Sequence, residues 1–139
     1  MDNRILVVSG DAQFRRAVEV ALVAQGHAVS LASASADALE IARTTRPHLL
    51  VTDLGGDEPE DGWSLAQRLK REMPRMRCLL VHPPHVEELP EPEFDPDLEA
   101  GWVCRFPRPF SMVQFAAAAD QAMRQVATES AAVRVGERG

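Results

Sequence analysis

Three side chains that could do chemistry together, Asp53, His82 and Arg108, each follow a run of mostly apolar residues. A carboxylate can bind a divalent cation, a neutral imidazole can donate one hydrogen bond, and a guanidinium can pair with phosphate. These three groups would form one site only if the apolar runs are strands whose ends meet at one edge of a sheet. The pattern of the whole chain must therefore decide whether such a sheet exists.

Short apolar runs alternate with segments of helical periodicity along the chain. The predicted strands cover residues 5–8, 28–32, 49–51, 78–81 and 102–106. The predicted helices cover residues 12–25, 36–46, 63–73 and 111–126, and the Gly-rich, acidic residues 55–62 predict a loop. This alternation calls for a parallel sheet with right-handed crossovers and helices on both faces. The functional crevice of such a sheet lies at the carboxyl ends of its strands.

Local signals set the ends of the predicted helices. Asp11 is available as the N-cap of the first helix and Gly26 ends it. Ser35 is the predicted cap of the second helix, which must end before a proline. Gln114 stands three residues after Ser111, which predicts a capping box at the start of the last helix.

The length of 139 residues fits one domain, and 45% hydrophobic residues are enough for an ordinary core. The formal net charge of -6 argues against unspecific binding to nucleic acid. No N-terminal targeting signal and no membrane span is expected. Cys78 and Cys104 lie in apolar segments, where buried thiols are common and no disulfide is implied, so we expect a reduced, cytoplasmic protein.

The negative charge gathers in one segment. Seven acids and no Lys or Arg lie between residues 86 and 100: Glu87, Glu88, Glu91, Glu93, Asp95, Asp97 and Glu99. Five prolines between residues 83 and 96 make a regular helix there unfavourable. With Leu89, Phe94 and Leu98 as apolar anchors, the segment is either a docking surface for a basic partner or a tolerated surface insertion.

The order of elements, Asp53 after the third strand, Asp61-Gly62 in the next loop, and Arg108-Pro109-Phe110 after the fifth strand together resemble the receiver domain of two-component response regulators. The resemblance covers residues 4–127. It implies a three-layer, flavodoxin-like α/β fold with five parallel strands in the order 2-1-3-4-5. Residues 1–127 then form the receiver domain and residues 128–139 a flexible tail, with no output domain. In that family a histidine kinase phosphorylates the third-strand aspartate, which makes Asp53 the candidate phosphoacceptor.

The resemblance is incomplete around the metal site. Family members hold Mg²⁺ with an acidic pair after the first strand, where this chain has Ser9 and Gly10. Asp11, one place further on, is either the helix N-cap, which we favour, or a displaced metal ligand. Asp11, Asp53 and Gly55 are therefore weak candidates for a Mg²⁺ site of low affinity, and no other cofactor is implied.

Two further positions differ from the family pattern. His82 stands at the position of a small hydroxyl residue, where it either contacts the phosphoryl group or fills the pocket. Arg108 stands at the position of a lysine and is the second candidate contact to the phosphoryl oxygens. The fourth helix, which in the family belongs to the partner-binding face, is predicted to be short or missing because of the prolines.

These observations favour an atypical stand-alone receiver domain that acts in phosphorelay signalling through protein–protein interaction, with phosphorylation at Asp53 weak or absent. The alternative is a receiver that switches conventionally at Asp53 with a modified Mg²⁺ site. A phosphatase with an aspartate nucleophile would need a second Asp where Gly55 stands, so no catalytic residue and no enzyme activity are predicted. The expected partner is a histidine kinase or another signalling protein, not DNA or a membrane. A homodimer through the last helix is a further possible assembly.

Overall fold

A computed structural model describes residues 4–53, 59–82, 102–107 and 110–124 of the chain. Its elements, in chain order, are β1 (Arg4–Val8), α1 (Ala12–Ala24), β2 (Ala28–Ala32), α2 (Ser35–Thr45), β3 (Leu49–Asp53), α3 (Pro59–Glu72), β4 (Arg77–His82), β5 (Val103–Pro107) and a helix over residues 112–124. The strands form one parallel sheet in the order β2-β1-β3-β4-β5. This is the predicted fold class and strand order.

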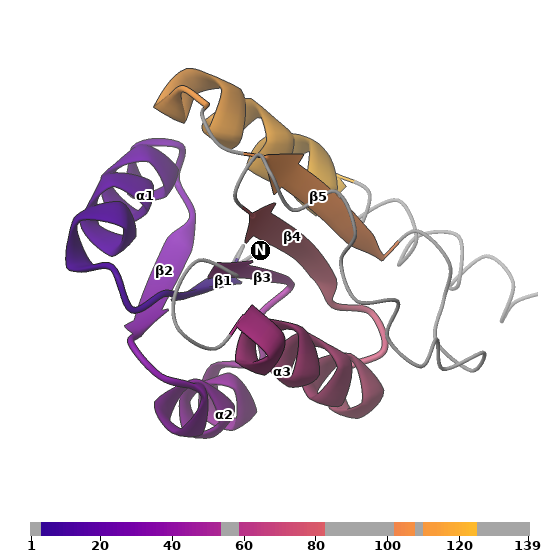
Figure 1. Cartoon of the computed structure of the whole chain (residues 1–139). Helices are drawn as coiled ribbons and strands as arrows, with labels where there is room; N and C mark the ends of the chain where they lie inside the picture. The colour runs from indigo at the N-terminus through magenta and orange to yellow at the C-terminus, as the bar shows by residue number, and fades with distance from the viewer. Residues whose placement is uncertain (1–3, 54–58, 83–101, 108–109, 125–139) are drawn as a thin grey trace, which may run out of the picture.

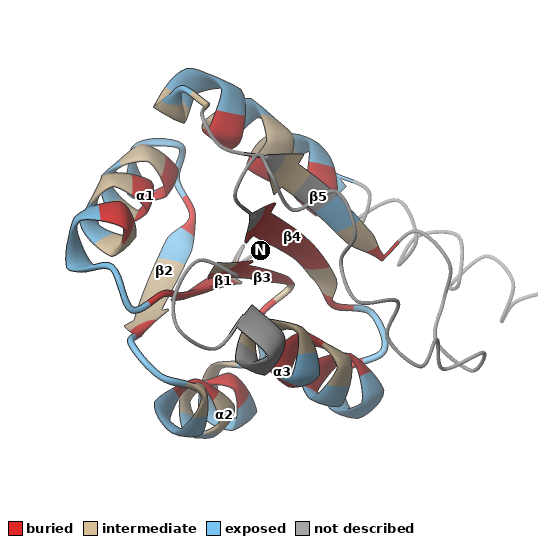
Figure 2. Cartoon of the chain, viewed as in Figure 1, coloured by how far each residue is buried: buried red, intermediate tan, exposed pale blue. Residues whose placement is uncertain are grey.

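The sheet lies between two layers of helices (Figure 1). Helices α2 and α3 cover one face, and α1 and the helix of residues 112–124 cover the other. The central strands are buried on both faces, as Figure 2 shows for β3 and β4, which explains why their sequences are continuous apolar runs. Because these strands run parallel, the carboxyl ends of β1, β3 and β4 meet at one edge of the sheet.

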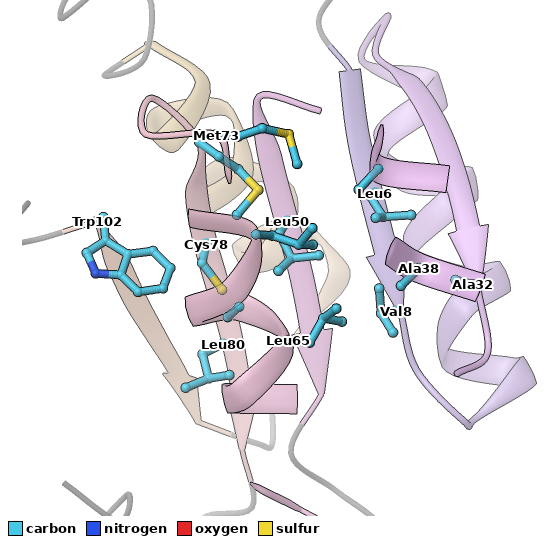
Figure 3. Packing of buried hydrophobic residues seen from close by; sticks show 14 residues of the cluster. Leu6, Val8, Ala32, Ala38, Leu50, Leu65, Met73, Cys78, Leu80 and Trp102 are labelled. Atoms are coloured by element: carbon cyan, nitrogen blue, oxygen red, sulfur yellow. The ribbon is translucent and has the colours of Figure 1, made fainter. Parts of the chain in front are cut away.

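The core on the α2 and α3 face contains the two tryptophans of the chain. Figure 3 shows Trp102, Cys78 and Leu80 in the buried cluster on this face. The rings of Trp63 and Trp102 are stacked with centroids 5.6 Å apart, and the Nζ of buried Lys70 lies 5.6 Å from the centroid of Trp102. Lys70 also donates hydrogen bonds to the carbonyl oxygens of Pro74 and Met76, so the ammonium group closes the turn between α3 and β4.

The opposite face has an aromatic core. Phe14 of α1 meets the rings of Phe110 and Phe115 edge to face, at centroid distances of 6.5 and 6.3 Å. Phe106 of β5 contacts the same two rings at 4.7 and 5.6 Å. Edge-to-face pairs of this kind add to the gain from area burial. They fix the start of the helix of residues 112–124 against β5 and α1.

The predicted caps at three helix ends are confirmed. Asp11 accepts from two backbone N–H groups at the start of α1, and Gly26 follows its C-cap with a φ of 91°, which glycine adopts without steric penalty. Ser111 and Gln114 form the capping box, with the Ser111 N–H donating to Gln114 Oε1 at 3.0 Å and the Gln114 N–H to Ser111 Oγ at 3.1 Å. These ends were predictable because each depends on a few neighbouring residues.

Two predicted helix starts are wrong. Ser35 is the first residue of α2 rather than its cap, and Ala34 stands at the N-cap without a side-chain hydrogen bond. Helix α3 begins at Pro59, inside the segment predicted as a loop. Proline fits the first turn of a helix because its missing N–H needs no partner there. The end of the segment predicted as a loop, residues 55–62, is thus the first turn of α3.

Several predictions fall outside the described residues. The short or missing fourth helix and the acidic segment of residues 86–100 lie within residues 83–101, and the predicted tail follows residue 124. The proposed domain boundary at residue 127 also lies beyond the described part. These stay predictions.

Candidate functional site

The candidate site lies where β1 and β3 end side by side. Val8 of β1 pairs with Thr52 of β3, so the next residues along, Ser9 and Asp53, are neighbours at the carboxyl edge of the sheet. Ser9 Oγ donates a hydrogen bond to Asp53 Oδ2 at 3.2 Å. Ser9 is buried and Asp53 is half-buried. The hydroxyl therefore contacts the one carboxylate that ends a central strand.

The N–H, the hydroxyl and the carbonyl oxygen of Ser9 all form hydrogen bonds. Its N–H donates to the carbonyl oxygen of Ala32 at 3.1 Å, and its hydroxyl accepts from the N–H of Asp11 at 3.1 Å. Its carbonyl oxygen accepts from Arg15 Nη1 at 2.6 Å. A hydroxyl fixed in both its accepting and its donating role keeps one orientation, so its bond to Asp53 is preorganised.

Arg15 was not predicted as a site residue. It lies one turn into α1, and it also lines an open pocket of about 510 Å³ beside the carboxyl end of β2. Ser33, Asp37 and Glu40 line the same pocket. The only signal in the sequence was helical spacing, which puts Arg15 one turn after the N-cap Asp11.

The carboxylate of Asp11 caps α1. Its Oδ1 accepts from the N–H of Gln13 at 2.9 Å and from the N–H of Phe14 at 3.2 Å. These two groups belong to the first turn of a helix, where backbone N–H groups have no partner within the helix. This geometry confirms the favoured prediction that Asp11 is the N-cap of α1.

The comparisons with known proteins place this geometry in a known fold. No family model matches the chain. The transcriptional regulatory protein AfsQ1 of Streptomyces coelicolor is 36% identical over 69 residues, which cover 48% of this chain and 29% of that protein. The match thus spans less than a third of the curated relative.

Solved structures of receiver domains superpose over nearly the whole chain. A response regulator receiver protein from Sinorhizobium medicae has a TM-score of 0.71 and 21% identity, covering 90% of this chain and 97% of that one. A CheY-like receiver domain from Methanospirillum hungatei has a TM-score of 0.77 and 18% identity, covering 93% and 99%. NtrX from Brucella abortus reaches 0.81 at 19% identity over 97% of this chain and 30% of its own. The chain has the receiver fold of response regulators.

In this receiver fold, Asp53 occupies the end of the third strand, as predicted. Val81 of β4 pairs with Asp53, so the backbone of His82, at the end of β4, reaches the same edge of the sheet. The side chain of His82 lies outside the described part of the structure, as do Gly55 and Arg108. Their roles at the phosphoryl and metal positions stay predictions.

The described donors do not fit a strong Mg²⁺ site. Mg²⁺ binds through carboxylates and waters in octahedral geometry. Of the two candidate carboxylates in the described structure, Asp11 accepts hydrogen bonds from backbone N–H groups of α1, and Asp53 Oδ2 accepts one from Ser9 Oγ. Within the described residues, no three His, Cys, Asp or Glu side chains come together closely enough to hold a metal ion. In the same part of the chain, no helix is both long and apolar enough to cross a membrane.

Proposed function

We propose that this chain is an atypical receiver domain that acts in phosphorelay signalling through protein–protein interaction, with phosphorylation at Asp53 weak or absent. The observation that carries the proposal is the hydrogen bond of 3.2 Å from Ser9 Oγ to Asp53 Oδ2. The receiver fold supports the signalling role. The hydrogen bond that the Asp53 carboxylate accepts from Ser9 supports the atypical character.

The electrostatics of phosphoryl transfer explain why this bond matters. A phosphoryl group that approaches Asp53 brings negative charge to a carboxylate that is already negative. At about 4 Å and an effective dielectric near 20, each uncompensated pair of unit charges costs roughly 4 kcal/mol. A neutral hydroxyl stabilises the carboxylate by one hydrogen bond but adds no positive charge. Ser9 thus holds Asp53 without supplying the neutralisation that the transfer requires.

The partner in this proposal is a histidine kinase or another signalling protein. The acidic residues between positions 86 and 100 would attract a basic surface and raise the rate of encounter. A homodimer through the helix of residues 112–124 also stays a proposal, and Val113 on that helix is 80% exposed.

Phosphorylation is tested directly by mass spectrometry. The protein is incubated with Mg²⁺ and acetyl phosphate, beside Asp53→Asn, which keeps the shape of the side chain and removes the acceptor. We expect little or no gain of phosphoryl mass in the wild-type protein. Stoichiometric labelling that disappears in Asp53→Asn would overturn the proposal and favour conventional switching at Asp53. Steady release of phosphate would instead favour an aspartate-dependent phosphatase.

A further inference from the structure

The amino-terminal edge of the sheet, opposite Asp53, is strongly basic. Helices α2 and α3 end at this edge, and the segments that lead from them into β3 and β4 are residues 43–49 and 70–77. These two segments contain one acid, Glu72, against five arginines and the buried lysine: Arg43, Arg46, Lys70, Arg71, Arg75 and Arg77. This edge is therefore basic although the net charge of the whole chain is negative.

A pocket of about 270 Å³ opens on this edge. It is lined by Arg46, His48 and Arg75 together with Pro47, Met73, Pro74 and Met76. Figure 3 shows Met73 on the far side of Cys78 from Leu80. Met73 therefore lies near the start of β4. The lining thus combines cationic groups with an apolar floor.

The two arginines of the pocket have no charge partner in the described structure. Glu72 is bound to Arg43, with 3.1 Å between Glu72 Oε1 and Arg43 Nη2. Neither Arg46 nor Arg75 forms an ion pair or a side-chain hydrogen bond there, and both side chains are exposed. Two guanidinium groups are thus available at the rim of one pocket.

The backbone does not explain why residue 46 is an arginine. Arg46 has a φ of 52°, in the left-handed region, which costs most residues other than Gly and Asn roughly 1–2 kcal/mol. The Nε of Arg4 donates to the carbonyl oxygen of Arg46 at 3.1 Å and fixes this turn. A glycine would fit the turn better, so the arginine side chain is the feature that needs an explanation.

We infer that this edge, through Arg46 and Arg75, binds an acidic segment of a partner protein that carries an apolar side chain. Guanidinium groups pair with carboxylates in a bidentate geometry, and the methionines and prolines accept the apolar side chain. Nucleic acid suits the site less, because a long polyanion also meets the net charge of -6 of the whole chain. The inference concerns the edge opposite Asp53 and does not depend on phosphorylation.

Fluorescence anisotropy tests the inference with a short labelled peptide in which Glu alternates with Leu. We expect binding at low salt that weakens as NaCl is raised, and no binding of the matching peptide with Gln in place of Glu. The double variant Arg46→Gln/Arg75→Gln should bind at least about tenfold more weakly, since each arginine forms charge-assisted hydrogen bonds. Circular dichroism confirms that the variant is folded.

Arg16→Gln is the matched control. Arg16 is also an exposed arginine, but it lies in the first turns of α1, at the carboxyl edge of the sheet. The Arg16→Gln and Asp53→Asn variants should both bind the peptide like the wild-type protein. Equal loss in Arg16→Gln and in the double variant, or no binding by the wild-type protein at low salt, overturns the inference. Tighter binding of a DNA duplex than of the peptide, lost in the double variant, also overturns it.

Discussion

The hydroxyl of Ser9 donates to the carboxylate of Asp53 across two neighbouring strands, with 3.2 Å between Oγ and Oδ2. A serine at this place gives Asp53 a neutral neighbour, while a carboxylate would give it a charged one. Two carboxylates this close repel each other, and a divalent cation relieves that repulsion. The first prediction follows from this difference.

Ser9→Asp should create a protein whose stability depends on Mg²⁺. Without Mg²⁺ we expect a lower melting temperature than that of the wild-type protein, because the new carboxylate lies against Asp53. Mg²⁺ at about ten times its Kd should restore about 1.4 kcal/mol. Thermal unfolding with and without Mg²⁺ measures the effect, and Ser9→Asn, which has similar volume and no charge, is the control. An equal Mg²⁺ response in the wild-type protein contradicts the prediction.

The second prediction separates the two roles considered for Asp11. As an N-cap that accepts from the N–H groups of Gln13 and Phe14, Asp11 contributes to the stability of α1. Asp11→Ala should lower the free energy of unfolding by about 1 kcal/mol, whereas Asp11→Ser should keep most of it, since serine also caps helices. Urea unfolding followed by tryptophan fluorescence provides both values. A serine variant as unstable as the alanine variant would show that Asp11 does not act as a cap.

The residues that were predictable from sequence act on near neighbours. Asp11, Gly26, and the Ser111 and Gln114 pair determine helix ends within a few residues, and apolar runs of three to five residues determine the strands. The bond between Ser9 and Asp53 joins residues 44 positions apart, so it depends on the register of β1 against β3.

Two other relationships were also missed, and each depends on how the elements pack. Arg15 reaches back to the carbonyl oxygen of Ser9, and the basic edge forms only when the ends of α2 and α3 are brought together. Sequence periodicity places each of these residues on an element, but packing decides which elements meet.

The third prediction concerns Lys70, a buried residue that is 1% exposed. Its Nζ donates to the carbonyl oxygens of Pro74 and Met76, so Lys70→Met leaves both acceptors without this donor. We expect a loss of about 1–3 kcal/mol of unfolding free energy, measured in urea. Arg68→Met, an exposed change on the same helix, should stay within about 0.5 kcal/mol of the wild-type protein. Equal effects of the two substitutions would contradict the role of Lys70.

The fourth prediction uses the two cysteines. Burial raises the pKa of the Cys78 thiol, and the charge of Cys104 raises it further, while Lys70 opposes the shift. The thiol of Cys78 is thus protonated in the folded state at pH values where the unfolded chain, with a thiol pKa of about 8.5, has lost the proton. Because the unfolded state then binds fewer protons, stability falls as pH rises.

The free energy of unfolding should fall above about pH 9 by up to roughly 1.4 kcal/mol per pH unit. Urea unfolding at a series of pH values measures this slope, and no tyrosine contributes because the chain has none. Cys78→Ala should flatten the slope, while Cys104→Ala, at an exposed cysteine, should keep it. A slope unchanged in Cys78→Ala would assign the alkaline effect to another group.

The last prediction concerns His27, which is buried with both ring nitrogens lacking a hydrogen-bond partner in the described structure. Buried polar atoms without partners are destabilising, so His27→Leu should raise the free energy of unfolding by about 1 kcal/mol. His48→Leu is the contrasting change, because His48 Nδ1 accepts from the N–H of Arg4 at 3.2 Å, and its loss should lower stability. Urea unfolding of the two variants should therefore move in opposite directions. A destabilised His27→Leu would mean that the imidazole has a partner, such as an internal water, that offsets its burial.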